Sequence, residues 1–262
     1  MKNIVITGST RGIGFGLAQQ FLQRGCSVAL NGRSEARVTQ TVARLGQDYD
    51  AARIVGQPGD VALPETHRAL WETAVSRFGT VDIWINNAGL SHDTLPLWEI
   101  PSATIRTTIE INVLGLLYGS QIAMQEMGKQ GHGQIYNMEG FGSGGRTRAG
   151  MSVYGTSKAA VAYASKALIK EAKGTAVQVC TLQPGMVMTD LVLDRFKEKP
   201  EELEKVKGIF NIIADTPENV TRWLAEKILA TRKHGTHLAY LPTYKLIGRF
   251  LSAPFSKRDL FA

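Results

Sequence analysis

Tyr154 and Lys158 are the two residues whose types and spacing most directly suggest proton chemistry. They lie four apart in the stretch YGTSK, so on a helix both side chains project from one face. A lysine ammonium beside a phenol favours the phenolate and lowers the phenol pKa toward neutral pH. A tyrosine tuned in this way is a general acid or base, so the pair predicts proton transfer to or from a substrate oxygen.

A glycine-rich turn near the N-terminus predicts a site for the phosphates of a dinucleotide. The stretch TGSTRGIG, residues 7–14, follows a short β-branched run and precedes a helical pattern. Gly8 permits a tight turn, Gly12 lets the backbone approach a pyrophosphate, and Gly14 allows the helix to pack closely on a sheet. Free N–H groups at the helix N-terminus complete the anion site. Because the spacing is G-x-x-x-G-x-G, the prediction depends on this position between a strand and a helix.

The end of the second predicted strand indicates which dinucleotide binds. An NAD site usually places a carboxylate there for the ribose hydroxyls, and the stretch LNGRS, residues 30–34, contains none. Arg33 lies there instead, and Arg11 lies in the glycine-rich turn. Two guanidinium groups near the adenosine ribose suit a 2′-phosphate, which they bind through charge-assisted hydrogen bonds. We therefore expect NADPH or NADP+ as the cofactor; the alternative is that both arginines are ordinary exposed surface.

The elements that must position these residues alternate regularly along the chain. Seven strands are predicted from β-branched runs at residues 2–8, 27–32, 52–57, 81–89, 133–138, 176–185 and 236–242. Helices are predicted between them, over residues 12–24, 34–46, 64–78, 101–128 and 152–173. Such alternation is typical of right-handed crossovers and a parallel sheet covered on both faces. We expect an α/β fold over residues 1–262: a single Rossmann-type domain with a doubly wound sheet of about seven strands.

Two segments fall outside this alternation. Residues 186–215 follow the end of the sixth predicted strand, where such sheets bind ligands, and we predict an insertion that covers the substrate. The C-terminal tail, residues 243–262, mixes leucine, isoleucine and phenylalanine with lysine and arginine. Two interpretations stay open for the tail: peripheral contact with an anionic membrane surface, or packing on its own domain or a partner subunit.

Composition limits the class of protein and its partners. The chain has 262 residues, 44% of them hydrophobic, but no apolar run of about 18 residues, so we expect no membrane-spanning helix. The apolar stretch in MKNIVITGST is short and is interrupted by the glycine-rich turn, so we expect no secretory signal. The net charge of +7 is spread along the chain, and no zinc-finger spacing or nucleic-acid module is present. We expect no metal site and no nucleic-acid partner. Cys26 and Cys180 are far apart, which favours reduced thiols and a cytoplasmic location.

The motifs together resemble the short-chain dehydrogenase/reductase family. Its order and spacing are matched over nearly the whole chain by TGSTRGIG, NNAG at 86–89, Asn112, YGTSK and QPGMVMTD at 183–190. The resemblance implies hydride transfer between NAD(P) and a small-molecule carbonyl or alcohol, in a homodimer or homotetramer. It also implies that Tyr154 protonates the carbonyl oxygen, that Lys158 holds the nicotinamide ribose, and that Asn112 supports a water relay to Lys158.

The same resemblance implies a set of cofactor-binding residues spread over the whole chain. They are Gly8, Ser9, Thr10, Arg11, Gly12, Ile13 and Gly14 in the turn, Asn31, Arg33 and Ser34 after the second strand, Asp60 and Val61 at the adenine, Asn87, Ala88 and Gly89 near the ribose, Tyr154 and Lys158, and Pro184, Gly185, Val187 and Thr189 at the nicotinamide.

The chain departs from the family after the fifth predicted strand. The family pattern N-x-S-S ends in a substrate-binding serine, whereas this chain has NMEG at residues 137–140 and therefore Gly140 in that place. The candidates to replace the serine are the Ser143 hydroxyl and the backbone N–H groups of residues 140–145. We favour Ser143 as the catalytic hydroxyl; the alternative is an ordinary loop serine. We interpret His92, after NNAG, as a surface histidine, with a place at the pocket mouth as the alternative.

A narrower resemblance concerns this unusual loop. IYNMEGFGSGG, QPGMVMTDLVL and FNIIADTPENV are similar to stretches of the plant chlorophyll b reductases. That resemblance implies NADPH-dependent reduction of a bulky lipophilic carbonyl, such as the 7-formyl group of chlorophyll b. Residues 185–193 and 209–213 would supply apolar walls. Two alternatives stay open: a reductase of a sterol, sugar or 3-oxoacyl ketone, and a catalytically silent NADPH-binding sensor or scaffold.

Overall fold

A parallel sheet of seven strands forms the centre of the computed structural model, which describes residues 1–193, 196, 200–253 and 258–261. The strand order is β3-β2-β1-β4-β5-β6-β9. The strands are β1 (Asn3–Ile6), β2 (Ser27–Gly32), β3 (Ile54–Pro58), β4 (Ile83–Asn86), β5 (Gly133–Met138), β6 (Val177–Gln183) and β9 (His237–Ala239). Each overlaps a predicted strand, so the predicted α/β fold is confirmed. The order reverses between β1 and β4, which makes the carboxyl ends of these strands the expected ligand site.

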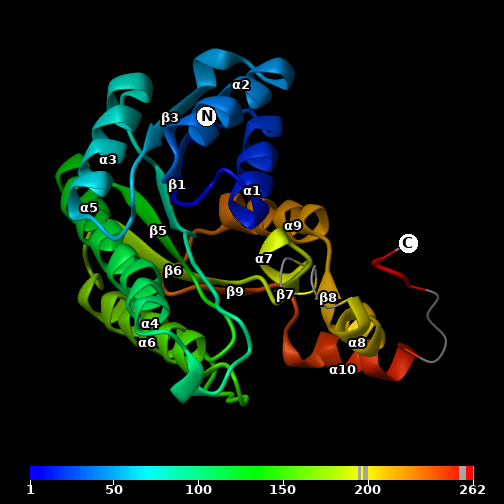
Figure 1. Ribbon diagram of the computed structural model, residues 1–262. Coiled ribbons are helices and arrows are strands. Elements are labelled where there is room, and N and C mark those ends of the chain that lie inside the picture. The colour runs from blue at the N-terminus through cyan, green and yellow to red at the C-terminus, as the bar shows by residue number, and fades with distance from the viewer. Residues whose placement is uncertain (194–195, 197–199, 254–257, 262) are drawn as a thin grey trace.

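Helices cover both faces of this sheet. One face carries α1 (Gly12–Gln23), α2 (Glu35–Asp48) and α9 (Pro217–Ala230). The other carries α3 (Pro64–Phe78), α5 (Gly115–Gln130) and α6 (Ser152–Glu171), with α4 (Ser102–Ile109) beside α6 (Figure 1). Because successive side chains of a strand point to opposite faces, β1 gives Ile4 and Ile6 to the first core and Val5 to the second. Short 3-10 turns, η1 (Ala51–Arg53) and η2 (Leu97–Glu99), complete the connections.

The helix predicted over 101–128 is interrupted. A π-helical turn, η3 (Glu110–Leu114), separates α4 from α5. A π turn inserts one extra residue into the helical ladder and widens it locally, and such turns often stand at functional sites. Hydrophobic periodicity does not reveal a single extra residue, so the sequence predicted one continuous helix.

The segment predicted to cover the substrate forms small elements of its own. It contains β7 (Met186–Val187), α7 (Asp190–Leu193), α8 (Pro200–Ile213) and β8 (Ala214–Asp215), and β7 pairs in parallel with β8. After β9 the chain forms α10 (Thr243–Ser252), which lies beside α8 (Figure 1). Residues 194–195 and 197–199 of the predicted insertion, and 254–257 and 262 of the tail, lie outside the described residues.

Asp215 joins the described part of the tail to the rest of the chain. Its carboxylate accepts hydrogen bonds from Arg249 Nη2 at 2.7 Å and from Tyr240 Oη at 2.8 Å, and Arg258 Nη2 lies 3.0 Å away. Burial alone would raise the pKa of Asp215, but hydrogen bonds from Asn219, Arg249 and Tyr240 lower it to about 2. These contacts hold α10 on the chain's own domain, in agreement with the packing alternative for the tail; contact with a membrane surface stays a prediction.

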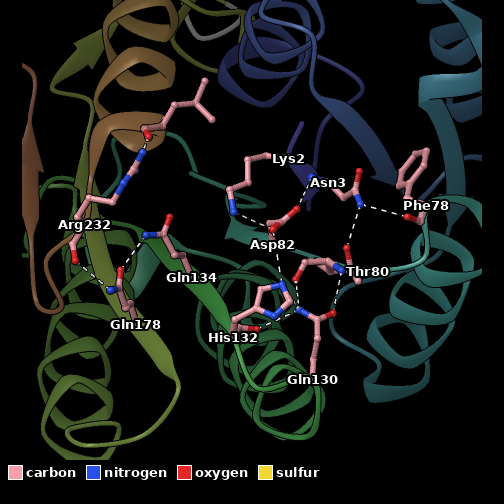
Figure 2. Close-up of polar contacts among 12 residues, drawn as sticks. Lys2, Asn3, Phe78, Thr80, Asp82, Gln130, His132, Gln134, Gln178 and Arg232 are labelled. Atoms are coloured by element: carbon pink, nitrogen blue, oxygen red, sulfur yellow. Dashed lines mark hydrogen bonds and ion pairs between the residues drawn. The ribbon is translucent and has the colours of Figure 1, made fainter.

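Polar contacts tie the strands together at the amino-terminal edge of the sheet. Asp82, just before β4, accepts hydrogen bonds from the Lys2 ammonium and the Asn3 N–H, both at 2.8 Å (Figure 2). Gln134 of β5 donates to the Gln178 side chain of β6 at 2.7 Å. These contacts lie at the edge of the sheet opposite the carboxyl ends of the strands, where a ligand is expected to bind. No helix in the described part of the chain is both long and apolar enough to cross a membrane.

Candidate active site

A cavity of about 1370 Å³ opens at the carboxyl ends of the parallel strands. The glycine-rich turn, the ends of β2, β4 and β5, and the first turns of α6 contribute to its lining. Every residue predicted to bind the cofactor lines it except Ser9; these are Gly8, Thr10, Arg11, Gly12, Ile13, Gly14, Asn31, Arg33, Ser34, Asp60, Val61, Asn87, Ala88, Gly89, Tyr154, Lys158, Pro184, Gly185, Val187 and Thr189. Residues from six parts of the sequence therefore meet at one site.

The glycine-rich turn has the close packing that a phosphate cradle needs. Gly8 has a φ of +61°, and a Cβ there would lie 2.8 Å from Ala88 Cα. A Cβ on Gly14 would lie 2.5 Å from the Gly8 carbonyl oxygen. Larger residues therefore do not fit, and the turn can present bare backbone at the start of α1. The residues present fit a bound dinucleotide.

Ser9 and Asn87 hold this turn from behind. The buried Ser9 hydroxyl donates to the Ile6 carbonyl at 2.8 Å and accepts from Asn31 N–H at 3.0 Å, which places it outside the described lining of the cavity. The Asn87 amide donates to the carbonyls of Thr7 at 2.9 Å and Gly8 at 3.0 Å. The side chains of both residues thus shape the turn, and Asn87 also lines the cavity. Their predicted contact with the cofactor stays a prediction.

Three guanidinium groups line the end of the cavity at β2. Arg11 and Arg33 were predicted there, and both are exposed side chains of the lining. Arg37 joins them from the first turn of α2, whose N-cap residue Ser34 accepts a hydrogen bond from Arg37 N–H at 3.4 Å. The sequence analysis missed Arg37, although its position four residues after Arg33 was a usable signal. Three positive charges at this end favour a phosphorylated ribose.

Gly140 lies directly against the proton-transfer pair. A Cβ at Gly140 would lie 2.6 Å from Tyr154 Oη and 3.2 Å from Lys158 Cγ. Lys158 Nζ donates to the Met138 carbonyl at 3.1 Å and lies 6.0 Å from the Tyr154 ring centroid. Burial lowers the pKa of Lys158 to about 8, and the Glu139 carboxylate opposes this shift. The Tyr154 hydroxyl can therefore take its present position only because residue 140 has no side chain.

The structure does not bring Ser143 to the cavity. Its hydroxyl accepts from Gly140 N–H at 3.1 Å and donates to the Lys158 carbonyl at 3.0 Å. Ser143 lies outside the described lining, whereas its neighbours Gly142 and Gly144 belong to it. In this conformation the hydroxyl fastens the loop to α6. The predicted role of Ser143 as the catalytic hydroxyl stays a prediction.

Asn112 stands in the π-helical turn and connects two parts of the site. Its Oδ1 accepts from Leu90 N–H at 2.7 Å, and its Nδ2 donates to the Leu90 carbonyl and the Ser157 hydroxyl, both at 2.9 Å. The residue is 1% exposed and lies outside the described lining. Asn112 thus joins the loop after β4 to α6, the helix that carries Tyr154 and Lys158. Its predicted support of a water relay to Lys158 stays a prediction.

His92 positions the first turn of α6. Its Nε2 accepts a hydrogen bond from Tyr154 N–H at 3.2 Å, and its Nδ1 donates to the Asp93 carbonyl at 2.6 Å. Met151 stands at the N-cap of α6, and its thioether side chain is a poor hydrogen-bond acceptor. His92 is only 7% exposed, so the interpretation as a surface histidine was wrong. The loop that folds it back over α6 carries no sequence signal for that contact.

Comparison with known proteins agrees with this arrangement. Residues 2–200 match the family described as short chain dehydrogenase. The probable chlorophyll(ide) b reductase NYC1 of Arabidopsis thaliana is 34% identical over 94% of this chain and 52% of its own length. The chlorophyll(ide) b reductase NOL of Oryza sativa subsp. japonica is 34% identical over 92% of this chain and 70% of its own. The chain thus spans about half the length of the first of these relatives.

A solved structure of similar shape carries the cofactor. The closed form of a serine dehydrogenase complexed with NADP+ superposes with a TM-score of 0.78 at 28% identity, over 90% of this chain and 93% of that one. The glycine cradle, the sheet order and the family match point to one conclusion. The chain belongs to the short-chain dehydrogenase/reductase family, and its cavity fits an NAD(P) cofactor.

Proposed function

We propose that the protein reduces an aldehyde or ketone group of a bulky, lipophilic substrate with NADPH, and that the formyl group of chlorophyll(ide) b is the leading candidate. The observation that carries the proposal is the apolar wall on the outer side of the cavity. It is built by Phe141, Met186, Val192, Ile209, Ile213, Leu246 and Phe250. These residues come from the loop after β5, from the predicted insertion and from α10, so the insertion and tail would cover a substrate. A lipophilic ligand is favoured by such walls.

The loop after β5 leaves room for a wide ligand. Between Glu139 and Arg146 the chain has four glycines, and a Cβ on Gly144 would meet open space. Phe141 is 38% exposed and supplies an aromatic surface over this space. A flat macrocycle fits an aromatic surface beside glycine backbone better than it fits a loop of larger side chains. The names of the NYC1 and NOL relatives support a tetrapyrrole as the substrate class.

The cofactor preference follows from charge at the opposite end of the cavity. Arg11, Arg33 and Arg37 line that end, and the second strand ends without a carboxylate. A 2′-phosphate would gain charge-assisted hydrogen bonds there, whereas a free ribose hydroxyl would lose its usual acceptor. The NADP+ bound in the similar serine dehydrogenase structure supports NADPH over NADH.

The proposed mechanism uses the pair on α6. When bound, the reduced nicotinamide supplies the hydride for the carbonyl carbon. Tyr154 donates its phenolic proton to the carbonyl oxygen, so that the alkoxide does not accumulate. Lys158 stabilises the phenolate that remains. The resemblance to the family implies that it also holds the cofactor ribose. The predicted homo-oligomer and cytoplasmic location stay predictions.

An absorbance titration tests the proposed function. The protein is mixed with NADPH and chlorophyllide b, and both the pigment spectrum and NADPH consumption are followed. We expect equimolar loss of NADPH and of the formyl pigment with the wild-type protein, and no turnover with Tyr154→Phe, which should still bind NADPH. Turnover of a small ketone without change in the pigment would favour a general reductase of this family. NADPH binding without turnover of any carbonyl would favour the sensor or scaffold.

A further inference from the structure

Glu139 places an acidic side chain inside the cavity, next to the proton-transfer pair. It stands directly before Gly140 and lines the cavity together with Lys158. Its side chain is 10% exposed, so the carboxyl group is largely removed from water. The reduction mechanism proposed above gives this group no role. Burying a carboxyl group costs free energy unless its partners compensate, so its surroundings show what it can do.

His237 connects Glu139 to the surface. Its Nδ1 lies 3.9 Å from Glu139 Oε2 and 2.7 Å from the Thr181 hydroxyl, and its Nε2 lies 3.3 Å from Gln183 Oε1. The pairing of β6 with β9 sets Thr181 beside His237, which fixes the imidazole at the rim of the cavity. The His237 side chain is 47% exposed, so the imidazole is in contact with solvent.

Lys158 lies at the inner end of the same row. Lys158 is 5% exposed. The negative charge of the Glu139 carboxylate raises the pKa of Lys158 and so favours its protonated form. Exposure therefore rises from 5% at Lys158 through 10% at the Glu139 side chain to 47% at the His237 side chain. The alternative route for protons is the water relay that Asn112 was predicted to support. The side-chain amide of Asn112 is already hydrogen-bonded to the Leu90 backbone and the Ser157 hydroxyl.

We propose that Glu139 and His237 form a relay that carries protons from solvent to Lys158 and, through it, to Tyr154. The proposal rests on the reductase activity proposed above. In each turnover the Tyr154 O–H bond breaks as the proton joins the carbonyl oxygen. Lys158 then gives a proton to the phenolate, the Glu139 carboxylic acid gives one to the Lys158 amine, and His237 returns one to the Glu139 carboxylate. Water restores His237, so one solvent proton is consumed for each hydride that the cofactor supplies.

The charges around Glu139 suit this role. Burial raises the pKa of the Glu139 carboxyl, while His237 from β9, and Lys166 and Lys158 from α6, oppose the shift. Burial lowers the pKa of Lys158 to about 8. The two shifts bring the proton affinities of the carboxyl and the amine toward each other, and transfer between groups of similar affinity is fast in both directions. Bridging water completes the path where the groups are not in direct contact.

Chemical rescue tests the relay. Glu139→Ala should lower kcat about tenfold or more while the Kd for NADPH, measured by fluorescence, stays unchanged. Added acetate should restore part of the kcat of Glu139→Ala, and imidazole part of that of His237→Ala, without accelerating the wild type. Glu171→Gln, an exposed change at the far end of α6, is the matched control and should behave as wild type. In Glu139→Gln the basic limb of the kcat profile should move to lower pH, because Lys158 loses the carboxylate that favours its ammonium.

A titration of the cofactor-free protein provides a readout independent of activity. With ¹³C-carboxyl-labelled glutamate, the NMR signal that disappears in Glu139→Gln should titrate at higher pH than those of exposed glutamates. His237→Gln and Lys158→Met should each raise that titration further, because each removes an opposing positive charge. An ordinary, uncoupled titration, or unchanged kcat without acetate rescue, would overturn the relay. An unreactive wild type would contradict the proposed function instead, while the NMR titration would still decide whether Glu139 is coupled to Lys158 and His237.

Discussion

At the scale of single residues, Gly140 determines how the proton-transfer pair is arranged. A Cβ at Gly140 would lie only 2.6 Å from the Tyr154 hydroxyl oxygen, which is closer than van der Waals contact allows. It would also lie 3.2 Å from the aliphatic carbons of Lys158. A serine in this frame would therefore displace the tyrosine unless the loop moved. The glycine is part of the site's geometry, and the family pattern alone would suggest that the site had lost a functional group.

Replacing this glycine tests that interpretation. Gly140→Ser should lower kcat by about tenfold or more, because displacing the acid weakens general acid catalysis. Gly128→Ser in α5 is the control, since a Cβ at this exposed glycine meets open space and the residue lies outside the described cavity lining. Steady-state kinetics and the NADPH Kd should show a loss of kcat with unchanged cofactor affinity for Gly140→Ser only. Higher activity in Gly140→Ser than in the wild type would contradict the role given to Gly140.

Arg33 is the residue on which the proposed preference for NADPH depends most directly. Arg33→Asp should reduce the ratio of kcat/KM for NADPH over NADH, because a carboxylate repels the 2′-phosphate and accepts from ribose hydroxyls. Arg37→Ala should weaken NADPH binding without improving NADH binding, since it removes a cation and adds no acceptor. Arg44→Ala on the same helix is the control, because the Arg44 guanidinium packs over the Phe15 ring. An unchanged preference in the triple variant of Arg11, Arg33 and Arg37 would exclude this site for the phosphate.

Tyr154, Lys158 and the glycine turn could be predicted from the sequence because their function depends on short spacings and on the order of motifs along the chain. Ser143 differs: a hydroxyl in a glycine-rich loop can turn toward a substrate or back onto the loop, and tertiary contacts with Gly140 and Lys158 decide. His92 was misjudged for the same reason, because only the folded loop shows that its ring accepts from Tyr154 N–H.

At the scale of elements, the start of α6 is held by a residue from another part of the chain. His92→Ala should remove the acceptor for Tyr154 N–H and lower the free energy of unfolding by about 1 kcal/mol, as expected for a lost helix cap. His92→Gln, which keeps an acceptor, should recover part of that loss. Urea denaturation and kcat measured on the same samples check both. Equal stability of the wild type and His92→Ala would refute the capping role.

The contact between Arg249 and Asp215 fixes the wall that α10 contributes. Arg249→Met should raise the KM for a lipophilic carbonyl several-fold, because α10 is released from β8, while the NADPH Kd should not change. Lys245→Met removes a charge from the same helix without touching Asp215 and is the control. An equal KM in both variants would separate α10 from substrate binding.

The Asp215 contacts also have a defined pH dependence. The pKa of Asp215 falls from 3.8 to about 2 on folding, so the stabilisation is complete above pH 3.8 and is lost as the pH falls toward 2.

The strands and most helices could be predicted because the spacing of hydrophobic residues along the chain indicates them. The π-helical turn, the short pair of β7 and β8, and the place of α10 depend on tertiary contacts, so the sequence left them open.

At the scale of the whole molecule, the sheet order explains why distant motifs meet. The glycine turn follows β1, the NNAG motif ends β4, and Glu139 and Gly140 follow β5, all at the same carboxyl edge. This convergence follows from the alternation of strands and helices and could be predicted. The walls at residues 209–213 of α8 were predicted from the sequence, and Ile209 and Ile213 line the cavity. The lining contributed by α10 could not be predicted, because the position of this helix is set by tertiary contacts such as that of Arg249 with Asp215.

Deuterium transfer tests the central claim most directly. NADPH that carries deuterium at the transferable position of the nicotinamide is incubated with chlorophyllide b and the protein, and the pigment product is analysed by mass spectrometry. We predict a hydroxymethyl product with one deuterium on the former formyl carbon, and no such product with Tyr154→Phe. A reduced pigment that lacks the deuterium, or wild-type protein that binds NADPH and leaves the formyl group intact, would contradict the account.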